Sequence, residues 1–171
     1  MTTSKPPLRL LFVCLGNMCR SPTAEALFRQ RAAERGVGDR FTTASAGVIA
    51  RGNDVAALDA VEVASAHGVD MHDHLSTPLT AEVIRSQDLI IVMDRMIAQD
   101  VLNLVPDLGT RLQLLMRFAP DGQPLDVPDP IGEPREVFEA SYRLIEAGVD
   151  GLLDALVEPD DPGDAGPPPV S

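Results

Sequence analysis

A cysteine and an arginine, separated by five residues, stand between an apolar run and a helical pattern. The run Leu10–Val13 predicts a short buried strand, Cys14 ends it, and Arg20 follows after five intervening residues. A strand, a tight loop and a helix start form an anion-binding site, because backbone N–H groups and the helix dipole point at one place. A thiolate is a nucleophile, and a guanidinium holds two phosphate oxygens at once. The spacing therefore predicts a cysteine nucleophile at the floor of a phosphate-binding loop.

The backbone of this loop is predicted to bind the phosphate through Leu15, Gly16, Asn17, Met18, Cys19 and Arg20. Gly16 would permit the unusual dihedrals that converging N–H groups need. Asn17 could hold the loop shape from within, and Ser21 could donate a hydrogen bond to the thiolate. Ser21 also suits a helix N-cap, with Pro22 as the first helical residue. Free cysteines are usually small buried hydrophobes, but the complete pattern favours chemistry.

An acid elsewhere in the chain must protonate the leaving group when a thiolate attacks phosphorus. Asp129 precedes Pro130 in a proline-rich loop at residues 120–134, and a carboxyl group in a loop can reach over a site. We predict Asp129 as the acid, with Asp126 and Asp121 as alternatives in the same loop.

The composition limits the classes of partner. The chain has 171 residues and a formal net charge of -12, which argues against nucleic acid and anionic membrane surfaces. No signal peptide or membrane span is predicted, and two cysteines make no disulfide framework, so we expect a cytoplasmic location. The three histidines lack the spacing of a metal site, and no metal or cofactor is expected. The oligomeric state stays open.

Apolar runs alternate with helical patterns along the chain. Strands are predicted at Leu10–Val13, Phe41–Ala46, Leu89–Met93 and Arg111–Leu115, and helices from Pro22 to Gly36 and at Val55–His67, Thr80–Arg85, Met96–Leu104 and Glu136–Val157. This order predicts an α/β domain with a central, mostly parallel four-stranded sheet flanked by helices. We expect a flexible lead-in at residues 1–7, the domain at 8–157 and a disordered acidic tail, rich in proline and glycine, at 158–171.

The segment Cys14–Pro22 resembles the phosphate loop of the low-molecular-weight protein tyrosine phosphatases, in particular their bacterial branch. Supporting matches extend from about Leu10 to Val157 and include Ser45-Ala46-Gly47, the residues around His74, Met93-Asp94 and Asp129-Pro130. The resemblance implies a metal-free reaction on a phosphorylated protein, with Cys14 as nucleophile and a phosphocysteine intermediate. It implies that Arg20 stabilises the transition states and that Asp129 acts as general acid and then as base.

Further roles follow from the same resemblance. Asn17, Ser45 and His74 would tie the loop in place, and Ser21 would support the thiolate. Cys19 lies within one loop of the nucleophile, so a reversible disulfide with Cys14 could protect it from over-oxidation.

The expected substrate pocket departs from the usual pattern. Tyrosine-specific members carry aromatic residues after the Asp-Pro pair and after Ser-Ala-Gly, where this chain has Ile131 and Arg51. Residues 45–54 and 126–132 are more similar to a branch with protein-arginine phosphatases. That branch has threonine in place of Met18, which here matches the tyrosine-specific members. We therefore predict hydrolysis of phosphotyrosine, with a protein-arginine phosphatase as the alternative.

Two other classes of protein fit the loop less well. Arsenate reductases share this loop and fold but need further cysteines to pass on oxidising equivalents, and this chain has two cysteines in all. A catalytically silent phosphate-binding module would lack the nucleophile, the arginine or the acid. Cys14, Arg20 and Asp129 are all present.

Overall fold

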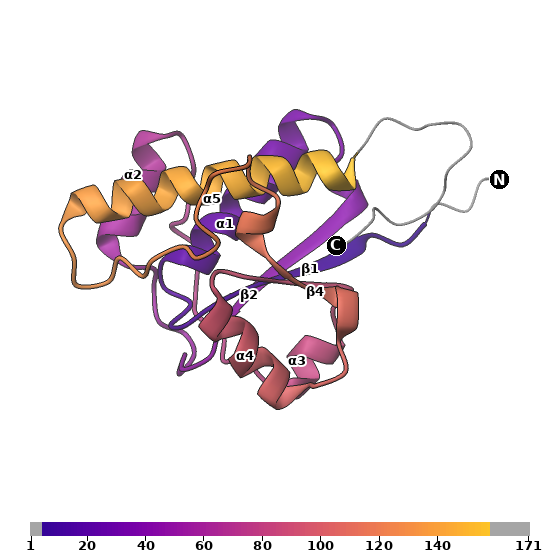
Figure 1. The fold of residues 1–171 in the computed structure, drawn as a ribbon. Helices are drawn as coiled ribbons and strands as arrows, with labels where there is room; N and C mark the ends of the chain where they lie inside the picture. Colours follow the sequence, from indigo (N-terminus) through magenta and orange to yellow (C-terminus); the bar gives the residue numbers. More distant parts are fainter. Residues whose placement is uncertain (1–4, 158–171) are drawn as a thin grey trace.

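A parallel sheet of four strands forms the centre of the molecule in the computed structural model, which describes residues 5–157 (Figure 1). The strand order is β2-β1-β3-β4, and every neighbouring pair is parallel. The strands are β1 (Leu8–Cys14), β2 (Phe41–Gly47), β3 (Leu89–Val92) and β4 (Leu112–Leu114). The predicted α/β fold with a four-stranded sheet is confirmed, and the sheet is parallel throughout.

Helices cover both faces of the sheet (Figure 1). The longer helices α1 (Arg20–Glu34) and α5 (Arg135–Leu156) lie on one face together with α2 (Leu58–Ala66), and α3 (Ala81–Arg85) and α4 (Arg95–Leu104) lie on the other. Single 3-10 turns occur at Gly38–Arg40, Gly109–Arg111 and Leu115–Arg117. Since parallel strands joined by helices are buried on both faces, this arrangement explains the continuous apolar runs of β1 and β3.

The central strand β1 divides the core into two layers. Leu10 and Phe12 point into the layer under α1 and α5, whereas Leu11 and Val13 point into the layer under α3 and α4. This alternation is the two-residue period of a strand. All four side chains are fully buried, so β1 holds the residue that follows Val13 in a fixed place.

Several predicted boundaries are wrong by a few residues. Helix α2 begins at Leu58 rather than at Val55, because Val55 pairs with Leu75 in an isolated bridge. Helix α1 begins at Arg20 with Cys19 as its N-cap, so Ser21 is not the cap and stands inside the first turn. Pro22 therefore occupies the third helical position, where its missing N–H still costs nothing.

The structure does not describe most of the two predicted end segments. The predicted tail at 158–171 lies outside the described residues, as do residues 1–4 of the predicted lead-in. Between residues 5 and 157 no helix has both the length and the apolar character to cross a membrane.

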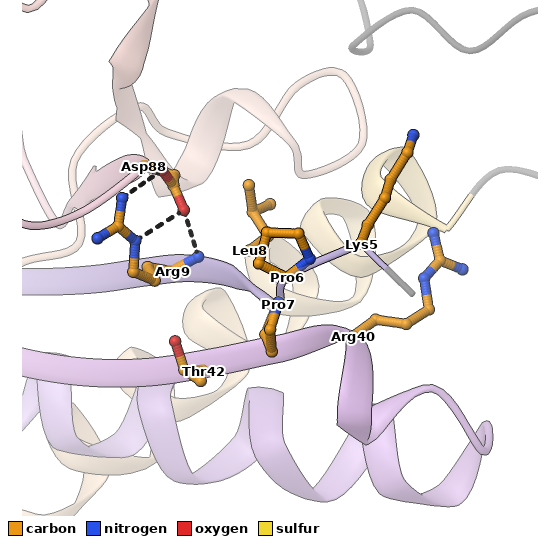
Figure 2. Close-up of a pocket in the computed structure, with 8 residues that line it drawn as sticks. All are labelled: Lys5, Pro6, Pro7, Leu8, Arg9, Arg40, Thr42 and Asp88. Atoms are coloured by element: carbon orange, nitrogen blue, oxygen red, sulfur yellow. Dashed lines mark hydrogen bonds and ion pairs between the residues drawn. The ribbon is translucent and has the colours of Figure 1, made fainter. Parts of the chain in front are cut away.

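A hollow of about 630 Å³ lies at the amino ends of β1 and β2 (Figure 2). Its lining residues are Lys5, Pro6, Pro7, Leu8, Arg9, Arg40, Thr42 and Asp88. The Arg9 guanidinium lies 2.9 Å from Asp88 and neutralises the carboxylate in its wall. Ligands of open parallel sheets bind at the carboxyl ends of the strands, so this end is the opposite of the expected one.

Replacing Tyr142 by phenylalanine should leave the free energy of unfolding unchanged or raise it by up to about 1 kcal/mol. The Tyr142 ring is buried and stacks on His67 with ring centroids 4.2 Å apart, but its hydroxyl has no hydrogen-bond partner among residues 5–157. Burial raises the pKa of Tyr142 to about 12, so the hydroxyl stays neutral near pH 7. Urea unfolding checks this prediction, with Tyr142→Ala as a control that should lose about 3 kcal/mol or more. A loss above 1 kcal/mol in Tyr142→Phe would contradict it.

Candidate active site

Cys14 ends β1 at the carboxyl edge of the sheet and is almost completely buried. Its Sγ atom lies 2.9 Å from the Ser21 hydroxyl and accepts a hydrogen bond of 3.2 Å from the Asn17 backbone N–H. Asn17 Nδ2 donates to the Ser21 oxygen at 2.8 Å, which leaves the Ser21 hydrogen free to point at the sulfur. Both neighbours of Sγ can thus donate to a thiolate, and hydrogen bonds to a charged group favour the charged form.

Asn17 holds the loop through both its side chain and its backbone oxygen. Its Oδ1 accepts a hydrogen bond of 2.8 Å from the Thr77 N–H, and its backbone oxygen lies 2.6 Å from His74 Nε2. Asn17 also carries the unusual dihedral of the loop, with φ at 56°, where asparagine is better tolerated than most residues. The prediction that Gly16 supplies this dihedral is wrong, since its φ is not positive.

The backbone of the loop offers free donors. In the part of the chain that the structure describes, the N–H groups of Leu15, Gly16, Met18 and Cys19 donate to no protein group. Buried donors are normally paired, so an unpaired series beside a pocket is suited to an anion with several oxygens.

Arg20 is 3% exposed, and its guanidinium is held at two points. Nη1 donates to Asp94 Oδ2 and to the Val127 backbone oxygen, each at 2.8 Å. The second oxygen of Asp94 caps α4 by accepting the Ile97 N–H at 2.8 Å. Because Nη1 is fully occupied by these anchors, the orientation of the whole guanidinium plane is fixed at the pocket.

Asp94 is a positioning residue for which the sequence predicts no role. Met93-Asp94 is one of the supporting matches to the family, and Asp94 follows β3, which neighbours β1 in the sheet. The carboxyl ends of adjacent parallel strands meet at one edge, and this rule could have identified Asp94.

Asp129 reaches over the same pocket from the proline-rich loop. Its Oδ2 lies 3.6 Å from Arg20 Nη2, and its Oδ1 accepts the Ile131 N–H at 3.1 Å. The alternative Asp126 lies 2.9 Å from the Arg95 guanidinium, which holds the pKa of Asp126 below its usual range and makes it a poor proton donor. The other alternative, Asp121, does not line this pocket.

The pocket above the loop has a volume of about 210 Å³. It is lined by Cys14, Leu15, Gly16, Met18, Cys19, Arg20, Ile49, Asp129 and Ile131. The predicted wall residues Met18 and Ile131 are therefore present, but Arg51 is exposed and does not line the pocket. Ile49 takes its place, because the Ile49 N–H bonds the Leu15 oxygen at 2.9 Å as the chain leaves β2.

Two further predicted residues have different outcomes. His74 contacts the loop through Asn17, as expected from the resemblance. Ser45 is buried in β2 opposite Phe12, and its side chain forms no hydrogen bond to the loop within residues 5–157. The tie attributed to Ser45 is made instead by the backbone after β2, where the Val48 N–H bonds the Cys14 oxygen at 3.1 Å.

Cys19 is a buried free thiol that lines the pocket beside Cys14. Burial raises the pKa of the Cys19 thiol above its usual range, and the nearby Cys14 acts in the same direction. Cys19 is therefore a neutral thiol near pH 7. No set of three or more His, Cys, Asp or Glu side chains within residues 5–157 is placed to hold a metal ion.

Replacing Gly47 by alanine should lower kcat/KM about 100-fold without unfolding the protein. A Cβ atom on Gly47 would lie 2.7 Å from both the Asn17 nitrogen and the Gly16 carbonyl carbon and 2.8 Å from the Leu15 oxygen. These are backbone atoms of the loop, so the loop itself would have to move. Steady-state kinetics checks this, with Gly16→Ala as a matched control.

The control should have a milder effect, because a Cβ on Gly16 would have no neighbour within 4 Å. Equal losses in the two variants would contradict the close-approach argument. An unchanged kcat/KM in Gly47→Ala would do so as well.

The chain matches known proteins over most of its length. Residues 9–160 match the family model described as low molecular weight phosphotyrosine protein phosphatase. The low molecular weight protein-tyrosine-phosphatase Wzb of Salmonella typhi is 33% identical over 151 residues, which covers 86% of this chain and 93% of the relative.

Two solved structures are similar throughout. Wzb of Vibrio vulnificus in complex with benzylphosphonate has a TM-score of 0.76 and 30% identity, covering 85% of this chain and 96% of the other. The YwlE arginine phosphatase has a TM-score of 0.80 and 30% identity, covering 89% of this chain and 97% of the other. The latter is a cysteine-to-serine mutant with a phosphorylated active-site serine.

Proposed function

Because the chain belongs to the low molecular weight phosphotyrosine protein phosphatase family, we propose that it hydrolyses phosphotyrosine in proteins and that Cys14, Arg20 and Asp129 carry out the reaction. One observation carries the assignment of residues. The thiol, the guanidinium and the carboxyl group line one pocket of about 210 Å³, with Arg20 and Asp129 only 3.6 Å apart. A phosphate bound to Arg20 therefore lies within reach of both the nucleophile and the acid.

In the first step the Cys14 thiolate attacks phosphorus. The S–P bond forms as the bond between phosphorus and the phenolic oxygen breaks, and Asp129 gives its proton to that oxygen. The free N–H groups of the loop and Nη2 of Arg20 stabilise the negative charge on the equatorial oxygens of the phosphoryl group. The phosphorylated serine in the cysteine-to-serine YwlE structure supports a covalent intermediate on the corresponding residue of that relative.

In the second step a water molecule attacks the phosphocysteine. Its oxygen bonds to phosphorus, the S–P bond breaks, and the Asp129 carboxylate takes up the water proton. The thiolate leaves in its starting charge state, stabilised by the Ser21 hydroxyl and the Asn17 N–H. Inorganic phosphate is the second product, and the enzyme returns to its initial state without a redox change.

A trapping experiment tests this mechanism directly. The protein is mixed with p-nitrophenyl phosphate in the presence of EDTA, quenched in the steady state, digested and analysed by mass spectrometry. We expect a phosphoryl group on the peptide that contains Cys14 and one equivalent of p-nitrophenol released in a burst. Label on any other residue, or hydrolysis without label, would overturn the assignment of the nucleophile. Phosphate binding without hydrolysis would identify a silent binding module instead.

A protein-arginine phosphatase is the second candidate function. The walls above the loop are the aliphatic Ile49 and Ile131, and no aromatic side chain is among the lining residues of the pocket. The similarity to the YwlE arginine phosphatase is consistent with this candidate. Met18 also lines the pocket. We propose it as the residue that selects the substrate, because its thioether suits an apolar ring better than a guanidinium.

Competing peptides separate the two candidates. We expect a higher kcat/KM for a phosphotyrosine peptide than for the matched phosphoarginine peptide, and Met18→Thr should shift the ratio towards phosphoarginine. An unchanged ratio would count against Met18 as the selector.

A cytoplasmic location and a Cys14–Cys19 disulfide remain predictions from the sequence.

A further inference from the structure

Two exposed aliphatic side chains, Ile49 and Ile131, line the catalytic pocket, and two more, Leu58 and Met96, follow residues that contact the active site. These four residues are here called the aliphatic rim. Their exposed fractions, in the same order, are 66%, 50%, 71% and 79%. Single exposed apolar residues are common, but exposed apolar residues on the segments that surround a catalytic pocket are candidates for an interaction surface. The group consists of one residue from each of four separate segments.

Ile49 and Ile131 form the inner part of the rim, because both also line the catalytic pocket. Ile49 is fixed by its backbone bond to Leu15, and Ile131 by its N–H donating to Asp129 at 3.1 Å. The backbone of both residues is therefore held beside the pocket.

Leu58 and Met96 form the outer part of the rim. Leu58 directly follows Ala57, whose N–H bonds the oxygen of the pocket residue Met18 at 2.8 Å. Met96 lies in the first turn of α4, two residues after the carboxylate that holds Arg20. Each thus belongs to a segment that contacts the active site through a neighbouring residue, but neither lines the pocket itself.

The charges beside the outer rim carry no excess of positive charge. Next to Met96, the Arg95 guanidinium lies 2.9 Å from Asp126. Next to Leu58, Arg135 lies 3.3 Å from the Asp59 carboxylate and also contacts Glu62, so one guanidinium serves two carboxylates. The rim consequently offers apolar contact area beside neutral or negative charge. The net charge of -12 of the whole chain adds a repulsion that acidic segments must overcome.

We propose that the aliphatic rim binds the residues that flank the phosphorylated residue of a protein substrate, an inference that rests on the proposed function. It selects segments with aliphatic, non-acidic flanks. The inner pair contacts the phosphorylated side chain, while Leu58 and Met96 contact its neighbours in the sequence. The rim therefore distinguishes between phosphoproteins, a choice that the phosphate loop alone cannot make.

Binding to a Cys14→Ser protein tests the rim independently of turnover. Three fluorescent phosphotyrosine peptides carry leucine, serine or glutamate on both sides of the phosphotyrosine. Fluorescence anisotropy should give the tightest binding for leucine and the weakest for glutamate. Adding Leu58→Ser and Met96→Ser should weaken binding of the leucine peptide about tenfold and leave the serine peptide nearly unchanged. Leu104→Ser, at the far end of the same helix as Met96, is the matched control and should change neither.

The outcomes of this experiment are separate from those of the proposed function. Equal affinities for the three peptides, equal losses for the leucine and serine peptides, or no binding at all would overturn the rim. In the background with Cys14 intact, Leu58→Ser with Met96→Ser should hydrolyse p-nitrophenyl phosphate at the normal rate, because this substrate has no flanks. Failure of the unchanged protein to hydrolyse that substrate would instead overturn the proposed function.

Discussion

A Cys14→Ser protein should hydrolyse p-nitrophenyl phosphate at least about 10⁴ times more slowly than the unchanged protein. The atoms beside Sγ are the Ser21 hydroxyl and the Asn17 N–H, at 2.9 and 3.2 Å. Both are donors, and neither can accept a proton from a serine hydroxyl. The site is therefore built for a nucleophile that is already ionised, which a thiol can be near neutral pH and an alcohol cannot.

Steady-state kinetics measures this loss, and inorganic phosphate binding shows whether the loop stays intact. Cys19→Ser is the control, since it changes the other buried thiol of the same loop. It should keep activity within about tenfold of the unchanged protein, because Cys19 is a neutral thiol held by burial. More than about one per cent of residual activity in Cys14→Ser would contradict a thiolate mechanism.

The fold could be predicted largely from the apolar pattern. The run before Cys14 and the run Leu89–Met93 are continuous because parallel strands are buried on both faces, and both form central strands. The sequence was less informative at the start of α2, where Val55 and Ala57 fit a helical pattern. Both instead form long-range backbone contacts, with Leu75 and Met18. Such contacts leave no periodic signal in the sequence.

The site was predictable where chemistry restricts the residue type and unpredictable where geometry decides. Only cysteine and arginine fit their roles in the loop, so their spacing identified both. Arg51 was expected as a wall from its distance along the chain, but the backbone bond after β2 brings Ile49 to the pocket instead. Likewise, the loop requires a positive φ at Asn17 rather than at Gly16 because the Asn17 side chain is bonded on two sides.

An Arg20→Lys protein should lose about 10³-fold in kcat, although the charge is kept. Nη1 of Arg20 already binds Asp94 and the Val127 oxygen, and Nη2 lies on the side of Asp129. A lysine has one nitrogen, which cannot hold these anchors and grip two phosphate oxygens at the same time. Because the side chain is only 4% exposed, water cannot replace the lost donors. Stopped-flow measurement of p-nitrophenol release gives the rate of the first step directly.

Two further variants separate positioning from charge. Arg9→Lys changes an exposed arginine that is also paired with a carboxylate (Figure 2). Arg9 lies near the amino end of β1, whereas Cys14 ends this strand, so this variant should leave kcat unchanged. Asp94→Asn keeps the shape of the anchor but removes its charge, so Arg20 loses orientation and kcat should fall about tenfold. If Arg20 is held as the contacts indicate, Asp94→Asn should have almost no additional effect in the Arg20→Lys background, because the two residues act as one unit. Fully additive losses in the double variant would mean that Asp94 acts independently of the guanidinium. A kcat of Arg20→Lys within tenfold of the unchanged protein would contradict the binding of two phosphate oxygens by Arg20.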